Sequence, residues 1–330
     1  MMLNFISFLF LVVLIIFTLI EKELYSAKVI GIILSYSIIF QSDIIEFLSA
    51  FSNFENTMTK MERSLTYTNL ISEKPQHLEN DNKINWPTKG EIEFINYSTR
   101  YRPDTKIVLK NLSFKIESNK RIGIVGRTGS GKSTIALCLF RILESLKGKI
   151  LIDGIDISTI GLQKLRKSLT ILPQDSTIVD GTLRYNIDPV GNYSDELIEE
   201  IMKKIGFYHI IENNQSGLDQ RVTENGSNLS IGEKQMICIT RAIVRKSKII
   251  VMDESTASID YQTEETILKA INEFLKNSTI ITIAHRIKTI INYDKILVLD
   301  NGSIVEYDTP ENLMKNKNSE FYSFYEKSLI

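Results

Sequence analysis

Cysteine and histidine are scarce in this sequence, and their positions exclude several kinds of site. Two cysteines and three histidines occur among 330 residues. Cys138 and Cys238 lie in apolar stretches far apart in the chain, so we expect buried, reduced thiols rather than a disulfide or a metal site. His77, His209 and His285 show no ligand spacing with one another or with the cysteines, which argues against a zinc site.

The chain also lacks an excess of charge of either sign. Lysine and arginine total 39 and aspartate and glutamate total 40, so the formal net charge is −1. A nucleic-acid-binding face normally needs a surplus of basic residues, so we expect no nucleic-acid partner. The sequence contains no internal repeat and no low-complexity tract, and its length suggests one or two domains.

Hydrophobic residues are concentrated at the amino-terminal end. Residues 1–20 carry no charged side chain, and a helix of that length reaches about 30 Å, the thickness of a bilayer core. A second apolar stretch, 29–40, is long enough to cross when 24–28 and 41–45 are added. We therefore expect two transmembrane helices in a lipid bilayer. A signal peptide stays open for the first stretch, although a basic start and a clear cleavage site are missing, and an interfacial or packed helix stays open for the second.

The rest of the chain changes in character. A long polar helix is predicted next, because Phe51, Phe54, Met58 and Met61 are near helical spacing. After a stretch rich in Asn, Lys, Glu and Pro, β-type runs appear, and from residue 122 onward short apolar strands alternate with helical patterns. That alternation is typical of an α/β domain with a largely parallel sheet. We expect three parts: a membrane part with its helical extension at 1–72, a linker at 73–90 and an α/β domain at 91–330.

A glycine-rich loop gives the strongest chemical signal. A buried strand runs into Gly126-x-x-Gly129-x-Gly131-Lys132-Ser133, and a helix follows. Glycines let successive backbone N–H groups wrap a phosphate, and the helix N-terminus adds positive charge. Lys132 can reach the β- and γ-phosphates, and the Ser133 hydroxyl can bind Mg²⁺. The alternative is a chance glycine-rich turn, which the strand before and the helix after make less plausible.

A pair of carboxylates follows a later strand. Residues 248–252 have the pattern of a strand, and Asp253 and Glu254 stand at its carboxyl end, where open α/β sheets bind their ligands. Asp253 can hold a metal through its water shell, and Glu254 can act as a general base on a water that attacks the γ-phosphorus. The alternative is that both carboxylates are solvated surface groups at the end of a strand. The presence of the phosphate loop in the same sequence favours the catalytic interpretation.

Further motifs carry a resemblance to a known family. Residues 229–235, Leu-Ser-Ile-Gly-Glu-Lys-Gln, resemble the signature of ATP-binding cassette (ABC) proteins, whose consensus is Leu-Ser-Gly-Gly-Gln. Four other features match in family order, so that the resemblance covers 91–320: the aromatic Tyr101, Pro173-Gln174 of the Q-loop, Ser258-Ile259-Asp260 of the D-loop, and Ala284-His285-Arg286 around the switch histidine. The resemblance implies a P-loop NTPase cassette with an antiparallel β part and a helical signature subdomain.

The resemblance assigns a role to each of these residues. It implies Glu254, His285, Gln174 and Lys132 for catalysis, and Ser133, Gln174 and Asp253 for Mg²⁺. For ATP it implies Tyr101, Ser230, Gly232 and the loop residues Gly126, Arg127, Thr128, Gly129, Ser130, Gly131, Lys132, Ser133 and Thr134. Plain readings also exist: Gln174 as a surface residue, His285 as a core histidine, and Tyr101 as an aromatic that packs.

Some residues resemble one subfamily more closely. The stretch 181–189, Gly126-Arg127-Thr128-Gly129 and the non-glycine residue Ile231 are similar to the second cassette of subfamily C, the multidrug-resistance-associated proteins. Residues 1–72 then resemble the last two transmembrane helices of such a protein. This resemblance implies an integral membrane protein with a cytosolic cassette that exports organic anions or conjugates. Its implied partners are a second cassette and further transmembrane helices, in the same protein or a separate chain.

Alternatives stay open on the extent of the chain and on its function. A truncated gene product, a fragment, and a diverged protein that uses a partner are all compatible with the sequence. A soluble ABC ATPase in repair or translation is one other class, and a regulatory or channel-forming relative is another. Within the signature, Ile231 and the negative charge of Glu233 depart from the consensus, and we expect them to weaken the partner site, unless Glu233 faces solvent or pairs with a basic residue.

Overall fold

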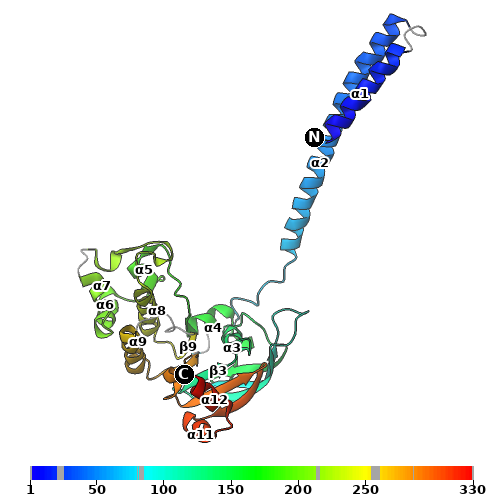
Figure 1. The fold of residues 1–330 in the computed structure, drawn as a ribbon. Helices are drawn as coiled ribbons and strands as arrows, with labels where there is room; N and C mark the ends of the chain where they lie inside the picture. Colours follow the sequence, from blue (N-terminus) through cyan, green and yellow to red (C-terminus); the bar gives the residue numbers. More distant parts are fainter. Residues whose placement is uncertain are drawn as a thin grey trace. The chain divides into compact units, whose positions relative to one another are not determined.

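The computed structural model describes residues 2–20, 26–79, 81, 85–212, 216–253, 261–284 and 286–328. These residues form two compact units, Met1–Glu73 and Lys74–Ile330. Figure 1 shows a pair of long helices in the first unit and a layered arrangement of sheets and helices in the second. Each unit is described by itself below.

The first unit consists of α1 (Met2–Ile20) and α2 (Ala27–Thr68), which lie side by side. Helix α2 has 42 residues and therefore a length of about 63 Å, roughly twice a bilayer core. Among the described residues, α2 is the one helix long and apolar enough to cross a membrane, while 8–20 form a shorter apolar helix. The second predicted span and the predicted polar helix are thus one continuous helix, and the span at 1–20 stays a prediction.

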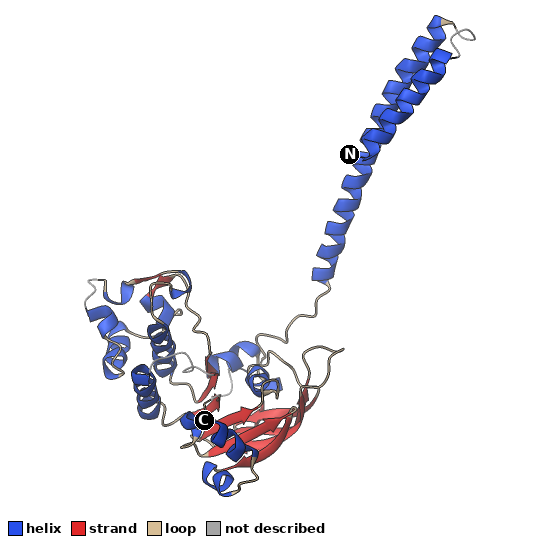
Figure 2. Cartoon of the chain, in the orientation of Figure 1, coloured by secondary structure: helices blue, strands red, loops and turns tan. Residues whose placement is uncertain are grey.

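Two main sheets organise the second unit, and both are drawn in red in Figure 2. The antiparallel sheet has the order β2-β1-β4-β5, with β1 (Ile92–Thr99), β2 (Leu109–Ile116), β4 (Lys147–Ile152) and β5 (Ile155–Asp156). The larger sheet has the order β12-β11-β3-β10-β9-β6. Its parallel strands are β3 (Arg121–Gly126), β6 (Leu169–Leu172), β9 (Ile249–Asp253), β10 (Thr279–Ile283) and β11 (Lys295–Asp300), and β12 (Ser303–Asp308) pairs antiparallel at its edge.

The parallel strands are continuous apolar runs because both of their faces are covered. In β9, Ile249 and Val251 join the cluster shared with the antiparallel sheet and α3 (Lys132–Leu139), whereas Ile250 and Met252 join a cluster on the other face. Successive side chains of a strand point to opposite faces, so each buried face takes every second residue. A third cluster forms around Phe321, against the short helices α10 (Ile287–Ile290), α11 (Pro310–Lys315) and α12 (Glu320–Lys327).

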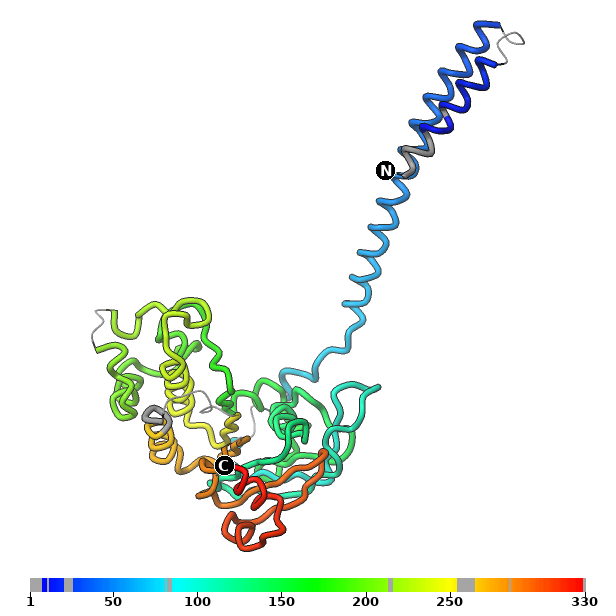
Figure 3. Tube along the Cα trace, in the orientation of Figure 1, coloured from blue at the N-terminus to red at the C-terminus, as the bar shows by residue number. Residues whose placement is uncertain are grey.

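A helical part and a small hairpin make up most of the region between β6 and β9. Figure 3 shows that the chain from green to yellow gathers to one side of the sheets. Polar residues cap the beginnings of helices in this region. Ser194 is the N-cap of α6, and its hydroxyl accepts a hydrogen bond from the N–H of Leu197. The elements are β7 (Gly181–Thr182), α5 (Leu183–Ile187), α6 (Asp195–Lys204), α7 (His209–Glu212), β8 (Arg221–Val222) and α8 (Ile231–Arg245), and α9 (Tyr261–Phe274) follows β9. The predicted fold class, an α/β cassette with an antiparallel part and a helical part, is confirmed.

The described residues between 74 and 91, most of which we expected to form a linker, make specific contacts with later parts of the second unit. Trp86 is buried, and its indole N–H donates to the main-chain oxygen of Ile152 at 2.8 Å. The Asp153 carboxylate accepts hydrogen bonds from the backbone N–H groups of residues 88–91, at 2.6–2.9 Å. Burial would raise the pKa of Asp153, but these bonds outweigh it and hold the pKa below its ordinary value.

The beginning of α4 (Leu162–Ser168) is also bound to this segment. Its N-cap residue, Gly161, donates its N–H to the Asp81 carboxylate at 3.0 Å, and Gln163 donates its N–H to the main-chain oxygen of Gln76 at the same distance. A Cβ on Gly161 would lie 2.2 Å from the Asp81 carboxylate, so glycine allows this close approach. Residues 76 and 81 therefore accept hydrogen bonds from N–H groups at the beginning of α4. Both residues belong to the second unit, because that unit begins at Lys74.

Candidate functional site

Some of the predicted site residues lie at one edge of the six-stranded sheet. The parallel strands β6, β9, β10 and β3 are neighbours, and all four end at this edge. Asp253, the last residue of β9, is level with Ile283 of β10, and Ile283 is level with Ile124, two residues before Gly126. The carboxyl ends of parallel strands are where open α/β sheets bind ligands. The sheet order thus brings the phosphate loop, Asp253 and the start of the Q-loop to a common edge.

Two glycines determine the shape of the phosphate loop, residues 126–133. Gly126 has φ +154°, and a Cβ there would lie 2.2 Å from the main-chain oxygen of Leu299, so no other residue fits without a shift. Gly129 has φ +82° and no neighbouring atom within 4 Å of the position of a Cβ. The backbone at Gly129 is therefore in the left-handed region beside open space, as a loop that wraps a ligand requires.

Polar groups of the same loop are arranged for an anion. Lys132 is only 6% exposed, and its ammonium donates to the main-chain oxygens of Gly126 at 2.9 Å and Arg127 at 3.0 Å. The Ser130 hydroxyl oxygen is buried and has no hydrogen-bond partner within the described part of the chain. Ser133 is exposed, as are 127–129. A buried cation, an unpaired buried hydroxyl and an open glycine loop at a helix N-terminus together fit a phosphate group.

Tyr101 lies in the turn between β1 and β2 and reaches the helix that follows the phosphate loop. Its hydroxyl and the Thr134 hydroxyl are 3.0 Å apart, within hydrogen-bond distance. Thr134 is buried, whereas Tyr101 is 51% exposed. The bond holds the phenol next to α3 while half of the residue stays accessible. An aromatic ring beside a phosphate loop can stack on a purine base.

The signature segment, residues 229–235, forms the start of α8. Ser230 is the N-cap, and it forms a capping box with Glu233. The N–H and the hydroxyl of Ser230 each donate to Glu233 Oε2 at 2.7 Å, and the N–H of Glu233 donates to the Ser230 hydroxyl at 3.2 Å. The Glu233 carboxylate thus pairs with Ser230, a partner that our sequence interpretation did not consider. The spacing Ser-x-x-Glu before a helix was the signal for it.

The Q-loop residue Gln174 is exposed, two residues beyond the end of β6. Its main-chain oxygen accepts a hydrogen bond from the side-chain Nε2 of Gln235, at 3.1 Å. Gln235 is 3% exposed and belongs to α8, so a residue of the signature segment holds the backbone of the Q-loop. Sequence reasoning missed Gln235, because nothing in the sequence pairs two residues so far apart.

Several predicted residues lie outside the described residues. Glu254, the D-loop residues Ser258, Ile259 and Asp260, and His285 belong to this group, so their roles stay predictions. Asp253 is described and half-buried at the end of β9. Within the described ranges, no group of three or more His, Cys, Asp and Glu residues could hold a metal ion. A Mg²⁺ site needs no such group, because Mg²⁺ commonly binds one or two carboxylates together with water and substrate phosphates.

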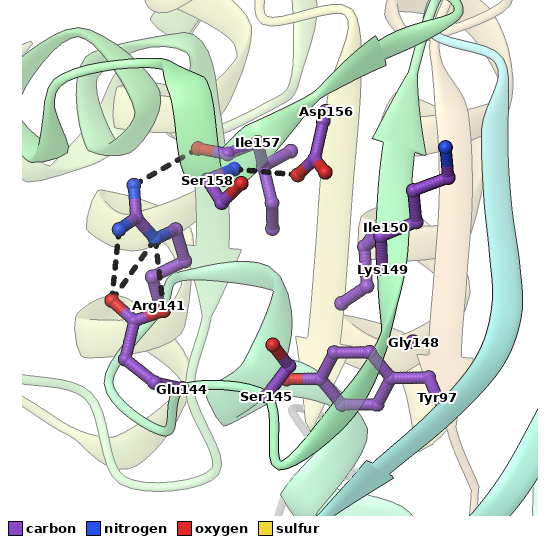
Figure 4. Close-up of a pocket in the computed structure, with 10 residues that line it drawn as sticks. All are labelled: Tyr97, Arg141, Glu144, Ser145, Gly148, Lys149, Ile150, Asp156, Ile157 and Ser158. Atoms are coloured by element: carbon purple, nitrogen blue, oxygen red, sulfur yellow. Dashed lines mark hydrogen bonds and ion pairs between the residues drawn. The ribbon is translucent and has the colours of Figure 1, made fainter.

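A small hollow near the end of α3 is a separate feature (Figure 4). The Arg141 guanidinium lies beside it and donates to the Glu144 carboxylate and to the main-chain oxygens of Ile157 and Ile160. The hollow measures about 30 Å³, enough for about two water molecules. It is therefore too small for a nucleotide, and Arg141 has a structural role there.

Both cysteines are buried and free, as expected. Cys138 lies in α3, where burial raises the pKa of its thiol to about 12. A thiol of that pKa is protonated at neutral pH and is a poor nucleophile or metal ligand. Burial also raises the pKa of the Cys238 thiol above its ordinary value.

Comparisons with known proteins agree with this geometry. A family model described as ABC transporter matches residues 109–257. ATP-binding cassette sub-family C member 2 of Rattus norvegicus is 44% identical over 303 residues, which are 92% of this chain and 20% of that protein. Bile pigment transporter 1 of Saccharomyces cerevisiae is 42% identical over 328 residues, 94% of this chain and 21% of that protein. The chain thus spans about a fifth of the length of these curated relatives.

A solved structure gives a similar result for the fold. A bacterial Atm1-family ABC exporter with ATP bound matches with a TM-score of 0.73 and 29% identity. The match covers 90% of this chain and 53% of that chain. The layered sheets and the helical part are therefore shared with an exporter.

Proposed function

Because the chain belongs to the ABC transporter family and is similar to proteins of its subfamily C, we propose that the second unit binds ATP with Mg²⁺ and hydrolyses it, and that hydrolysis drives export across a membrane. The observation that carries this proposal is the phosphate loop. The loop combines the open backbone at Gly129, the buried ammonium of Lys132 and the buried hydroxyl of Ser130, which has no hydrogen-bond partner among the described residues. Asp253, the last residue of β9, lies at the same edge of the sheet.

The proposed reaction is phosphoryl transfer from ATP to water. Lys132 and the N–H groups of the loop bind the phosphates, and Tyr101 stacks on the adenine. Ser133, Gln174 and Asp253 would hold Mg²⁺, which when bound offsets the negative charge of the phosphate oxygens. Glu254 accepts a proton from the water that attacks the γ-phosphorus, and His285 and Gln174 complete the site.

The proposed partner is a second cassette. In the family that the chain resembles, Ser230 and Gly232 would meet the γ-phosphate of ATP bound to that cassette. Each active site then has a phosphate loop from one cassette and a signature from the other. Closing and opening of this pair would move the attached helices and so couple hydrolysis to transport.

Transport is proposed for organic anions or conjugates, in an integral membrane protein with its cassette on the cytosolic side. One relative is named as a bile pigment transporter, which supports a substrate of this kind. The test is uptake of a fluorescent organic anion into inside-out vesicles that contain the chain together with a second cassette and further transmembrane helices. We expect uptake with Mg-ATP and none when Glu254 is changed to Gln. An ATP-gated current without uptake would favour the channel-type alternative, and a chain absent from the membrane fraction would contradict export.

The role of Tyr101 gives a prediction of moderate size. Tyr101→Ala should weaken ATP binding by about 1–2 kcal/mol, the order of one aromatic stack, and Tyr101→Trp should preserve binding. The matched control is Tyr185→Ala, since Tyr185 is about equally exposed but belongs to α5 of the helical part. The measurement is equilibrium binding of ATP. If Tyr101→Ala binds ATP as tightly as the wild type, Tyr101 serves packing alone.

A further inference from the structure

We propose that Gln235 is a positioning residue for the ATPase reaction: it holds the backbone of the Q-loop, and through it Gln174, against the signature helix α8. This proposal rests on the proposed function, in which Gln174 serves the metal and the attacking water. It assigns Gln235 no contact with substrate. It predicts that a change at Gln235 alters how the site uses Mg²⁺ rather than whether it binds ATP.

The first observation is the contact itself. Gln235 is 3% exposed, and its Nε2 donates to the main-chain oxygen of Gln174 at 3.1 Å. The two residues are 61 positions apart in sequence. Gln174 is an exposed residue, so its backbone is held while the residue as a whole stays accessible. A loop residue that must be accessible and yet precisely placed needs a fixed backbone of this kind.

The second observation is that the polar amide of Gln235 is buried beside an apolar cluster. The other polar atom of its amide, Oε1, is buried and has no hydrogen-bond partner in the described part of the chain. Ser176 follows Gln174 by two residues and lies beside Cys238, which is three residues after Gln235 on α8. Leu172, Ile178 and Met236 belong to the apolar cluster at the contact between α8 and the Q-loop, which we call the seam.

An apolar residue would pack in this seam without leaving an amide oxygen unpaired. Leaving a buried polar atom unpaired is costly, so a glutamine here needs a reason beyond packing. The bond to the Q-loop supplies that reason. The position of Gln235 also connects two sites, because α8 begins at the signature, which serves the partner's ATP, and the Q-loop serves the chain's own ATP.

The first test uses no nucleotide and so does not depend on the proposed function. Asp175 is exposed, and both native cysteines are buried, so a nitroxide on Asp175→Cys reports selectively on the Q-loop. We compare its electron paramagnetic resonance spectrum in the wild-type background with that in Gln235→Leu. The control is Thr240→Val, since Thr240 is fully buried in the same helix and bonds to Met236 instead. We expect a more mobile label in Gln235→Leu alone, and equal mobility in all three would overturn the proposal.

The second test measures the reaction with the full chain. In Gln235→Leu, the Mg²⁺ concentration for half-maximal ATP hydrolysis should rise about tenfold, the order of one lost hydrogen bond, while ATP binding in EDTA stays within about twofold. Thr240→Val should match the wild type in both. An unchanged Mg²⁺ requirement with a lower melting temperature would reduce Gln235 to a structural role and overturn the proposal. A wild-type chain without ATPase activity in the presence of a second cassette would refute the proposed function, while the nitroxide spectra would still decide whether Gln235 holds the loop.

Discussion

Changing Glu254 to Gln should lower the rate of ATP hydrolysis by about 10²- to 10⁴-fold, the usual effect of losing a general base. Binding of ATP should be nearly unchanged, because glutamine keeps the size of the side chain and the phosphates are bound by another part of the site. Asp253, the preceding residue, ends β9 level with Ile283 of β10, and Ile283 is level with Ile124 of β3, the strand that leads to the phosphate loop. Phosphate release and equilibrium ATP binding, measured on the same preparation, test both halves of the prediction.

The contrasting change is Lys132→Ala, which should abolish ATP binding itself. Lys132 is buried beside the phosphate loop, where its ammonium bonds to the oxygens of Gly126 and Arg127, and a phosphate would take the place of such acceptors. Lys120→Ala is the matched control, since Lys120 lies just before the other end of β3 and pairs with Asp294. If Glu254→Gln hydrolyses ATP at the wild-type rate, or if Lys132→Ala still binds it, the assignment of these two roles is wrong.

The elements around the site were predictable because their signals are local in sequence. Strand, glycine loop and helix follow one another within 121–139, and each is recognisable from its own residues. Asp253 was predictable in the same way, since a strand of purely apolar residues ends at it. Their meeting at one edge follows from a general property of parallel sheets, so that the sequence sufficed for it.

Contacts between distant residues were not predictable from one sequence. Residues 73–90 have the composition of a linker, yet Trp86 is buried against β4 and Asp153 binds the backbone of 88–91. The deciding partner is a single aspartate more than sixty residues away, and its side chain could equally have faced solvent. The bond between Gln235 and Gln174 was hidden for the same reason.

Glu233 is an intermediate case. From the sequence, the negative charge of Glu233 had two interpretations. It could repel the phosphates of ATP on the partner cassette, or it could lie at the surface without an effect on that site. The structure shows its carboxylate bound to the N–H and hydroxyl of Ser230, the group that the family resemblance assigns to the γ-phosphate. The Ser230 hydroxyl must exchange this partner before it can donate to a phosphate, which is consistent with a weakened signature. A capping box is local, so this contact could have been predicted from the spacing alone.

The second unit in isolation should lose almost all ATPase activity per molecule when it is diluted. In the proposed function each active site needs the signature of another cassette, so turnover depends on association and should rise faster than linearly with protein concentration. The protein for this test should begin at Lys74 rather than at residue 91, where we expected the α/β domain to start, because the earlier start keeps Trp86 in the core and the Asp81 contact with Gly161. Phosphate release is measured from micromolar to nanomolar protein, and strictly linear activity over that range would contradict a shared site.

Complementation then separates association from a general loss of activity. A Lys132→Ala unit keeps its signature but cannot bind ATP, and a Ser230→Ala unit binds ATP but lacks the signature hydroxyl. Each variant alone should be nearly inactive, whereas a mixture forms one site with an intact phosphate loop and an intact signature. Because Ser230 also caps α8, Ser230→Ala should lower the free energy of unfolding by about 1 kcal/mol. Thermal melting of the variant measures this loss of stability, so that it can be separated from the loss of activity. Recovered activity in the mixture supports two-cassette sites, and a mixture no more active than the sum of its parts shows that the two motifs do not act across an interface between copies of this chain.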